Sequence, residues 1–367
     1  MTEALRAEAQ RAEAQRAEAL GDLRDAVRGL LASAGDGASV WPRLCREVGV
    51  AGLAIPERYG GAGAGAAEVG VVMEELGRGL TPSPMLGSAV LAAQALLGTG
   101  DEAACGRLLP AIAAGSATAA LAWTTRAGRW SVGEVGYRAA RVAGGWQLDG
   151  EAHYVLDGEG ADVLLVAARG PAGVGLFEVD PGQDGVSRTA SVTMDAARAL
   201  AVVRLTGVRG SRIGGDAAGA LARARDLACL ALAAEQAGAA RRALELTTGY
   251  TLTRVQFGRV IGSFQALQHR LADLHVLVES AVSLSRAAAA AEEGAGLGLR
   301  AAAAAAKVYC CEAAMRTAAE MIQLHGAIGI TWEHPAHRYL KPAHGALHLF
   351  GGPAQHTAAI AASLIDC

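Results

Sequence analysis

The strongest constraint on the fold is a proline-free run over residues 217–254, in which Leu and Ala recur at helical spacing. This pattern predicts one helix that is much longer than the average in globular proteins. Two further long helices are predicted over residues 264–293 and 300–324, and a shorter fourth over residues 355–365. Four helices in succession predict a helix bundle in this part of the chain.

The first part of the chain is also helical in pattern. It opens with a repeat of Arg, Ala, Glu, Ala and Gln, which are mostly strong helix formers, and this predicts a solvated helix that continues towards Leu31. Further helices are predicted over residues 41–48, 66–77 and 86–97. The proline and glycines of residues 55–65 predict a loop between the first two of these.

The middle part of the chain has a different period. Residues 139–156 alternate between apolar and polar side chains around a Gly144-Gly145 turn, and more strands are predicted over residues 162–168, 174–180 and 199–205. Regularly spaced turn signals are typical of an antiparallel β domain. The order of the three parts predicts an α+β fold: an N-terminal helical domain (residues 1–115), a middle β domain (116–215) and a C-terminal four-helix bundle (216–367).

Composition argues against several functional classes. Hydrophobic residues make up 52% of the chain and charged residues 19%, which is too apolar for a disordered protein. The net charge of −3 without a long basic run argues against nucleic acid as a partner. No stretch reaches the roughly 18 uncharged residues that a membrane span requires. The charged N-terminus and the six cysteines without a C-x-x-C pair favour a cytoplasmic protein with free thiols.

Histidines gather late in the sequence, and His344 and His348 are one helical turn apart, a spacing that can bind a metal. No cysteine or carboxylate nearby completes such a site. We therefore expect solvated histidines at the end of the bundle and no metal.

Two segments could carry ligand chemistry. In residues 250–273 a long helix ends at Arg254, and the chain turns over Gly258 and Gly262 before the next helix begins. An arginine at such a turn either pairs with a phosphate or is a solvated residue favoured by the helix dipole. In residues 323–333, small residues that follow a helix either let the backbone approach a ligand closely or form a plain helix cap.

In this order, the two segments resemble the acyl-CoA dehydrogenase family, whose patterns are R-x-Q/T-F-G-x-x-I-x-x-F-Q and Q-x-x-G-G-x-G. Residues 52–65 and 72–84 resemble its N-terminal motifs, so the resemblance extends over nearly the whole chain. It implies the three-domain fold predicted above. It also implies that FAD accepts the β-hydride of an acyl thioester while a carboxylate removes the α-proton.

The resemblance also assigns candidate cofactor residues. Arg254 matches the arginine that contacts the FAD pyrophosphate across a subunit interface. Phe257 of the same motif is also a candidate for cofactor binding. The segment that holds the adenosine part of FAD in the neighbouring subunit is matched by Gln323, Leu324, Gly326 and Ala327, the last of which stands where glycine is usual. Such contacts imply at least a dimer, either of identical chains or with a homologous subunit.

The β domain departs from the family pattern. The flavin loop T-E-P-x-A-G-S-D corresponds to residues 124–131, which follow Trp123; Thr124 is kept, and Trp130 replaces the serine. The W-I-T motif corresponds to residues 154–156. Tyr154 keeps an aromatic platform for flavin, whereas Leu156 cannot offer the threonine hydroxyl that bonds flavin N5.

The catalytic base is not identified from the sequence. Phe350 occupies the usual glutamate position, and the alternative position on the first bundle helix falls near Ala228. Asp226 matches the aspartate of a substrate-contacting D-x-x-R motif, whose arginine is Cys229 here. Glu235, further along the same helix, is a candidate base only by default.

Three functions follow from the resemblance. The first is FAD-dependent α,β-dehydrogenation of a thioester of coenzyme A or of an acyl carrier protein. The second is a non-catalytic subunit of a heteromeric dehydrogenase that contains a homologous catalytic chain. The third is a repurposed member of the family that binds a ligand without redox chemistry.

Overall fold

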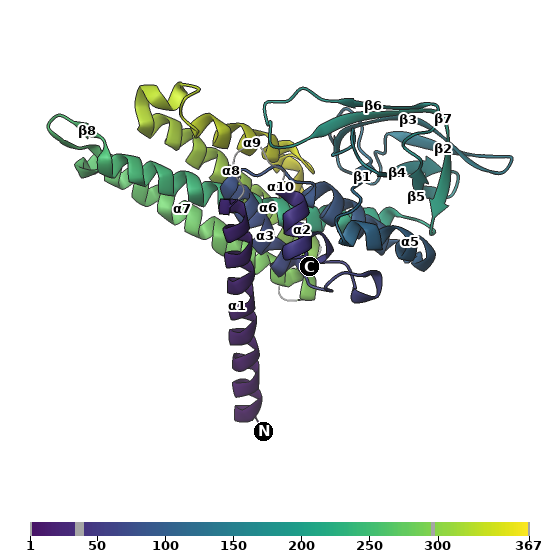
Figure 1. Ribbon diagram of the computed structural model, residues 1–367, viewed down its shortest axis with the longest axis horizontal. Coiled ribbons are helices and arrows are strands. Elements are labelled where there is room, and N and C mark those ends of the chain that lie inside the picture. Colours follow the sequence, from purple (N-terminus) through teal and green to yellow (C-terminus); the bar gives the residue numbers. More distant parts are fainter. Residues whose placement is uncertain (1, 34–39, 295–297, 366–367) are drawn as a thin grey trace.

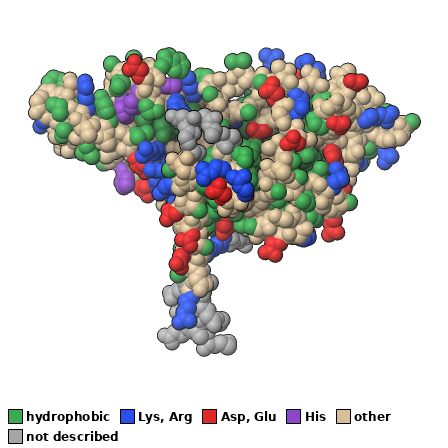
Figure 2. Space-filling view, in the orientation of Figure 1, with side chains coloured by type: hydrophobic (Ala, Val, Ile, Leu, Met, Phe, Trp, Pro, Cys, Tyr) green, Lys and Arg blue, Asp and Glu red, His purple; other side chains and the backbone are tan. Residues whose placement is uncertain are grey.

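The computed structural model describes residues 2–33, 40–294 and 298–365. Long helices run along the length of the body, the β-sheet lies at one end, and the first helix projects sideways (Figure 1). In the space-filling view the outer part of this helix stands clear of the body (Figure 2). Cys367 lies outside the described residues.

The N-terminal region is helical, as predicted, with one helix that the sequence analysis missed. The helices are α1 (Thr2–Ser33), α2 (Trp41–Glu47), α3 (Ala66–Gly79), a π-helical segment (Met85–Ala92) that runs into α4 (Ala93–Gly98), and α5 (Glu102–Ala113). Helix α5 was not predicted. Its first turn is capped by Asp101, whose Oδ1 accepts a hydrogen bond from the Ala104 amide at 3.0 Å.

The middle region is a seven-stranded sheet that closes on itself. Its strands are β1 (Ala119–Ala122), β2 (Tyr137–Val142), β3 (Gly145–Leu156), β4 (Val163–Gly170), β5 (Gly173–Val179), β6 (Val186–Ala190) and β7 (Leu200–Ile213). Their order is β1-β4-β2-β3-β7-β5, with β6 against β7 and β5 also against β4. The closed sheet surrounds a core that includes Tyr137, Leu148 and Phe177.

The sheet is mixed, which corrects the prediction of an antiparallel β domain. Strand β4 pairs in parallel with β1 and with β2, while the remaining pairs are antiparallel. The alternation of side chains identifies the buried face of a strand but not the direction of its neighbour, so sequence alone could not reveal the parallel pairs.

The C-terminal region contains α6 (Ala218–Thr253), a hairpin of β8 (Val255–Gln256) and β9 (Arg259–Val260), α7 (Gln265–Ala289), α8 (Leu299–His325), α9 (Ala336–His348) and α10 (Pro353–Ile365). The four predicted helices are present, and α9 is additional. Helix α9 begins after Pro335 and contains Pro342, and these prolines hid its pattern. It buries Tyr339, Ala343 and Ala346 on one face.

Glycines let α3 and α6 come into direct backbone contact. A Cβ atom added at Gly238 would overlap the carbonyl oxygen of Glu74, and one added at Gly77 would overlap that of Glu235. Glycine at both positions is therefore a requirement of this packing.

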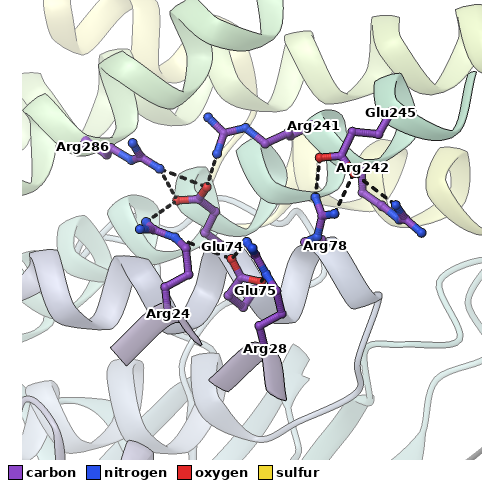
Figure 3. Close-up of polar contacts among 9 residues, drawn as sticks. All are labelled: Arg24, Arg28, Glu74, Glu75, Arg78, Arg241, Arg242, Glu245 and Arg286. Atoms are coloured by element: carbon purple, nitrogen blue, oxygen red, sulfur yellow. Dashed lines mark hydrogen bonds and ion pairs between the residues drawn. The ribbon is translucent and has the colours of Figure 1, made fainter. Parts of the chain in front are cut away.

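The inner end of α1 is held by an ion-pair cluster (Figure 3). Glu74 and Glu75 of α3 are buried, and their carboxylates receive guanidinium groups from α1, α6 and α7: Arg24, Arg28, Arg241 and Arg286. Burial alone would raise the pKa of Glu74, but the nearby guanidinium groups of Arg286, Arg24 and Arg241 outweigh it and lower that pKa. The Glu74 carboxylate therefore keeps its negative charge at neutral pH. None of the described helices is long and apolar enough to cross a membrane.

Candidate functional site

A cavity of about 730 Å³ lies between the β-sheet and the C-terminal helices. Its walls come from the loop after β1, the end of β3, the loop between β6 and β7, helix α9 and the turn before α10. Side chains that matter to its chemistry are Arg129, Tyr154, Asp195, Arg198, Lys341 and His348. The rest of the lining is mainly apolar or glycine, which suits a flat, largely apolar ligand.

Tyr154 is the one β-domain candidate for cofactor binding whose side chain lines this cavity. Its hydroxyl donates a hydrogen bond to the Arg126 carbonyl at 3.2 Å. By contrast, Trp123 and Leu156 are buried in the core. The Thr124 hydroxyl donates to the Arg129 carbonyl at 2.8 Å, so it stabilises its own loop.

An ion-paired corner closes one side of the cavity. The guanidinium of Arg198 donates to Glu235 Oε2 at 2.7 Å, and its Nε lies 3.4 Å from Asp195 Oδ2. Burial opposes the charge of Arg198, but Glu235 and Asp195 outweigh it and raise its pKa. Arg198 Nε and Asp195 Oδ2 are buried without a hydrogen-bond partner and both residues face the cavity, so they can receive polar groups of a ligand.

Glu235 is therefore engaged by Arg198, and it lines a separate small cavity rather than the large one. Asp157 lines the same small cavity, and burial raises its pKa to about 7, against a lowering effect of Arg198. Glu235, a candidate base from the sequence, is thus paired with Arg198. Asp157 was not predicted as a site residue.

A second, more polar cavity of about 170 Å³ lies behind Trp130. It is lined by Asp226 and Phe350, and also by Arg225, Arg300 and His356. Asp226 accepts two hydrogen bonds from its neighbour Arg225, at 3.0 and 2.7 Å. Arg225 in turn donates to the Trp130 carbonyl at 3.1 Å.

Phe350 is buried at the edge of this cavity. Its ring meets Trp130 edge to face, with centroids 4.9 Å apart, and Trp130 meets Trp123 in the same way at 5.7 Å. Three aromatic rings thus pack in a row between the two cavities, and no carboxylate stands at position 350.

The other predicted cofactor residues lie at the opposite end of the bundle, at the β8–β9 hairpin and the end of α8 (Figure 1). Tyr250 stacks on His325 at 4.3 Å, which brings these two segments together. Leu324 is buried, whereas the remaining candidates are exposed: Arg254, Phe257, Gln323, Gly326 and Ala327. One chain therefore presents two groups of candidates at two ends and does not bring them together.

Backbone strain marks several of these positions. Among the described residues that are not glycine, five have a positive φ, and three of them are Tyr154, Phe257 and Phe350. Bulky side chains rarely adopt this conformation, and such strain tends to cluster at functional sites.

None of the identified motifs contains Asp195, Arg198 or Lys341, and α9 was not predicted, so these three were not predicted as site residues. His348 was considered from the sequence only as a possible metal ligand. Within the described part of the chain, no group of three His, Cys, Asp or Glu side chains could hold a metal ion.

Comparison with known proteins agrees with the architecture. The family model "Acyl-CoA dehydrogenase, N-terminal domain" matches residues 8–116, and "Acyl-CoA dehydrogenase, C-terminal domain" matches residues 219–365. Acyl-CoA dehydrogenase IpdE2 of Mycobacterium tuberculosis is 40% identical over 330 residues, which cover 89% of this chain and 87% of that protein.

Two solved structures are similar over almost their full length. A variant of the Tcur3481-Tcur3483 steroid ACAD has a TM-score of 0.84 and 30% identity, and the match covers 95% of this chain and 98% of that chain. The ChsE4-ChsE5 complex from Mycobacterium tuberculosis has a TM-score of 0.84 and 29% identity, with the same coverage.

Proposed function

The chain belongs to the acyl-CoA dehydrogenase family, and on that premise we propose that it holds FAD and takes part in the α,β-dehydrogenation of an acyl thioester. The observation that carries the proposal is the cavity of about 730 Å³ between the sheet and the helices, with Tyr154 in its wall. When bound there, FAD would supply the hydride acceptor of the reaction.

The residues of this cavity fit a flavin. The flat aromatic face of Tyr154 and the backbone of Gly128 and Gly352 leave room for a planar ring. The buried Arg198 Nε has no hydrogen-bond partner and can donate to a ligand oxygen, while Lys341 adds a positive charge in the same wall. Arg254 and Phe257 lie at the end of the molecule opposite the sheet, where they would contact the cofactor of a neighbouring chain.

A specific observation favours the second function, a subunit that does not supply the catalytic base. Phe350 stands where the family pattern has glutamate, and its ring is buried against Trp130. Removal of the α-proton requires a carboxylate within hydrogen-bond reach, so we propose that a homologous partner chain supplies it. Two of the similar structures carry paired names, ChsE4-ChsE5 and Tcur3481-Tcur3483, in line with a partnership of two different chains.

The substrate class proposed here is a steroid-derived acyl thioester of coenzyme A. It rests on the similarity at 30% identity to a protein described as a steroid ACAD. The domain limits at residues 115 and 215, the individual site residues and the cytoplasmic location stay predictions.

The test compares the chain expressed alone with the chain co-expressed with a homologue that has glutamate at the position of Phe350. We expect flavin absorbance in the co-purified assembly, and anaerobic bleaching of that flavin by an acyl-CoA. Rapid bleaching by the chain alone would contradict the non-catalytic assignment. A colourless assembly with no affinity for added FAD would contradict the proposed function as a whole.

A further inference from the structure

Two departures from the family pattern, which are far apart in sequence, are in contact in the fold. Trp130 replaces a small serine of the flavin loop, and Phe350 replaces the usual glutamate. Their rings meet edge to face at 4.9 Å, and Trp130 separates the large cavity from the small polar one. Trp130 lines both cavities and Phe350 lines the small one, so the two rings together occupy the boundary between them.

The backbone that carries Phe350 is held by a buried lysine of α8. Lys307 is fully buried, and its ammonium donates to the Leu347 carbonyl at 2.7 Å and to the Gly351 carbonyl at 2.6 Å. Within the described part of the chain it has no ion pair with a carboxylate. The two carbonyls therefore provide the only described polar contacts of this ammonium, and they lie on either side of Phe350.

A histidine of α10 holds the same loop from the other side. His356 is buried, and its Nε2 donates to the carbonyl oxygen of Phe350 itself at 3.1 Å. Burial, together with the nearby charge of Lys307, lowers the pKa of His356 to about 4, so the ring is neutral and one nitrogen can donate. Hydrogen bonds to the carbonyls of residues 347, 350 and 351 thus fix a turn in which Phe350 has a positive φ.

The loop cannot swing away without leaving a buried ammonium and a buried imidazole without partners, which is costly. We propose that Trp130 and Phe350 form a fixed aromatic plug that excludes an acyl thioester from this chain, and that Lys307 and His356 are positioning residues that hold it. This inference rests on the proposed function and deepens it: the cavity of this chain would accept FAD but not the thioester.

The first experiment removes the plug from the purified chain. Trp130→Ser and Phe350→Gly are combined, because glycine tolerates the positive φ at position 350. The probe is octanoyl-CoA, and binding is measured by calorimetry on the chain alone, while the flavin content of each sample is recorded. We expect no measurable binding to the parent and binding in the micromolar range to the double variant.

Equal affinity of the parent and the double variant would overturn the plug, and so would the absence of binding to both. Flavin content reports on the proposed function separately. A chain that never retains or takes up FAD, but gains octanoyl-CoA binding when the plug is removed, would overturn the cofactor assignment and leave the plug intact.

The second experiment tests the positioning residues by hydrogen exchange. Lys307→Met keeps an unbranched side chain of similar shape and removes the ammonium with both of its hydrogen bonds. The amides of Leu349, Gly351 and Gly352 report on the loop, since each donates a hydrogen bond that ties the loop to the end of α9 or to the start of α10. We expect these amides to exchange at least tenfold faster in Lys307→Met, together with a gain of octanoyl-CoA binding.

The matched control is Cys310→Ala, which removes another buried side chain of α8 that contacts the Ala281 carbonyl rather than the loop. A general loss of stability would affect both variants, whereas only Lys307→Met should release the loop. If Lys307→Met does not fold, His356→Phe replaces it and His356→Gln, which restores a donor, serves as the rescue. Unchanged loop exchange in the folded variant would overturn the positioning role.

Discussion

Asp157, the residue that follows β3, carries a pKa far from that of an ordinary aspartate because its carboxyl group is shielded from solvent. Burial raises the pKa to about 7, against the opposing effect of Arg198. Because the native state binds this proton more tightly than the unfolded chain, the resulting stability is fully present below about pH 4. It is lost as the pH rises through about 7.

Asp157→Asn should remove this pH dependence, because the amide mimics the protonated carboxyl group. We expect parent and variant to melt together near pH 4. The parent should then lose stability relative to the variant as the pH rises towards 7, and the variant should be more stable at pH 8 by roughly 2–4 °C. The measurement is the melting temperature across this range, with Asp184→Asn on the exposed surface as the control. Parallel curves for the parent and Asp157→Asn would show that the carboxyl group is not held protonated.

The contact between Phe350 and Trp130 predicts how substitutions at these two positions change dehydrogenase activity. Phe350→Glu alone introduces a carboxylate, but Trp130 still fills the neighbouring space at 4.9 Å. We therefore expect Phe350→Glu to leave the chain without dehydrogenase activity, whereas Trp130→Ser with Phe350→Glu should gain it. General base catalysis contributes about 10²–10⁴-fold, and this is the gain expected in anaerobic flavin reduction by an acyl-CoA.

The two single variants are the controls for this gain, since neither should show more than a small part of it. Full activity of Phe350→Glu without a change at Trp130 would mean that the indole does not occupy the substrate position. Activity in none of the variants would mean that position 350 does not face the thioester.

At the scale of elements, the contact between α3 and α6 depends on glycine. A Cβ at position 238 would overlap the Glu74 carbonyl, so Gly238→Ala must push the two helices apart. The expected cost in free energy of unfolding is about 1–3 kcal/mol or more. Urea denaturation monitored by circular dichroism would measure it.

Gly249 of the same helix provides the comparison. No atom lies within 4 Å of a Cβ added there, and the residue is exposed. Gly249→Ala should therefore be neutral or stabilise by up to about 1 kcal/mol through helix propensity. If the two alanine variants unfold at the same urea concentration, the close approach of α3 and α6 is not a constraint on the fold.

The elements also show how far sequence reasoning extends. Long proline-free runs predicted α6, α7 and α8 to within a few residues, because helical periodicity over many turns has few alternative explanations. Helix α9 was missed because its prolines resemble helix breaks, and β1 and β6 were missed because they are short. The α+β fold class is confirmed, whereas the parallel pairs of β4 depend on tertiary contacts that no local pattern records.

The candidate site was predicted less completely than the fold. Motif resemblance identified Tyr154 and the exposed segments around Arg254 and Gln323, and their roles stay predictions. It could not identify Arg198 or Lys307, because their importance comes from burial and from partners distant in sequence. It predicted Trp130 and Phe350 as departures from the family pattern, and the contact between their rings is visible only in the folded chain.

At the scale of the whole molecule, the two groups of candidate cofactor residues lie at opposite ends of one chain (Figure 1). The end opposite the sheet exposes apolar side chains, among them Phe257 of the β8–β9 hairpin and Ile330 after α8. Exposed apolar surface of this kind is typical of an interaction surface. A second chain would cover it and would bring Arg254 of one chain towards the flavin cavity of the other.

Arg254→Ala therefore tests the assembly and the cofactor together. The side chain is exposed, so its loss should leave the melting temperature of the isolated chain nearly unchanged. In the co-purified two-chain assembly, it should remove the charge-assisted contact that we propose to the FAD pyrophosphate, and such a contact is worth about 1.5–3 kcal/mol. This corresponds to a roughly 10- to 150-fold weaker retention of FAD, measured by dialysis against flavin-free buffer.

Two controls make the result specific to the proposed geometry. Arg138→Ala removes an exposed arginine from the sheet at the other end and should retain FAD as the parent does. Phe257→Ser should dissociate the assembly in sedimentation, since it removes an exposed aromatic ring from the apolar end, whereas Arg254→Ala should leave it associated. Because the arginine is proposed to act in trans, Arg254→Ala in this chain should deplete the flavin held in its partner's cavity. Depletion of only the flavin held in its own cavity would show that Arg254 acts within its own chain, which would contradict the proposed contact across the interface.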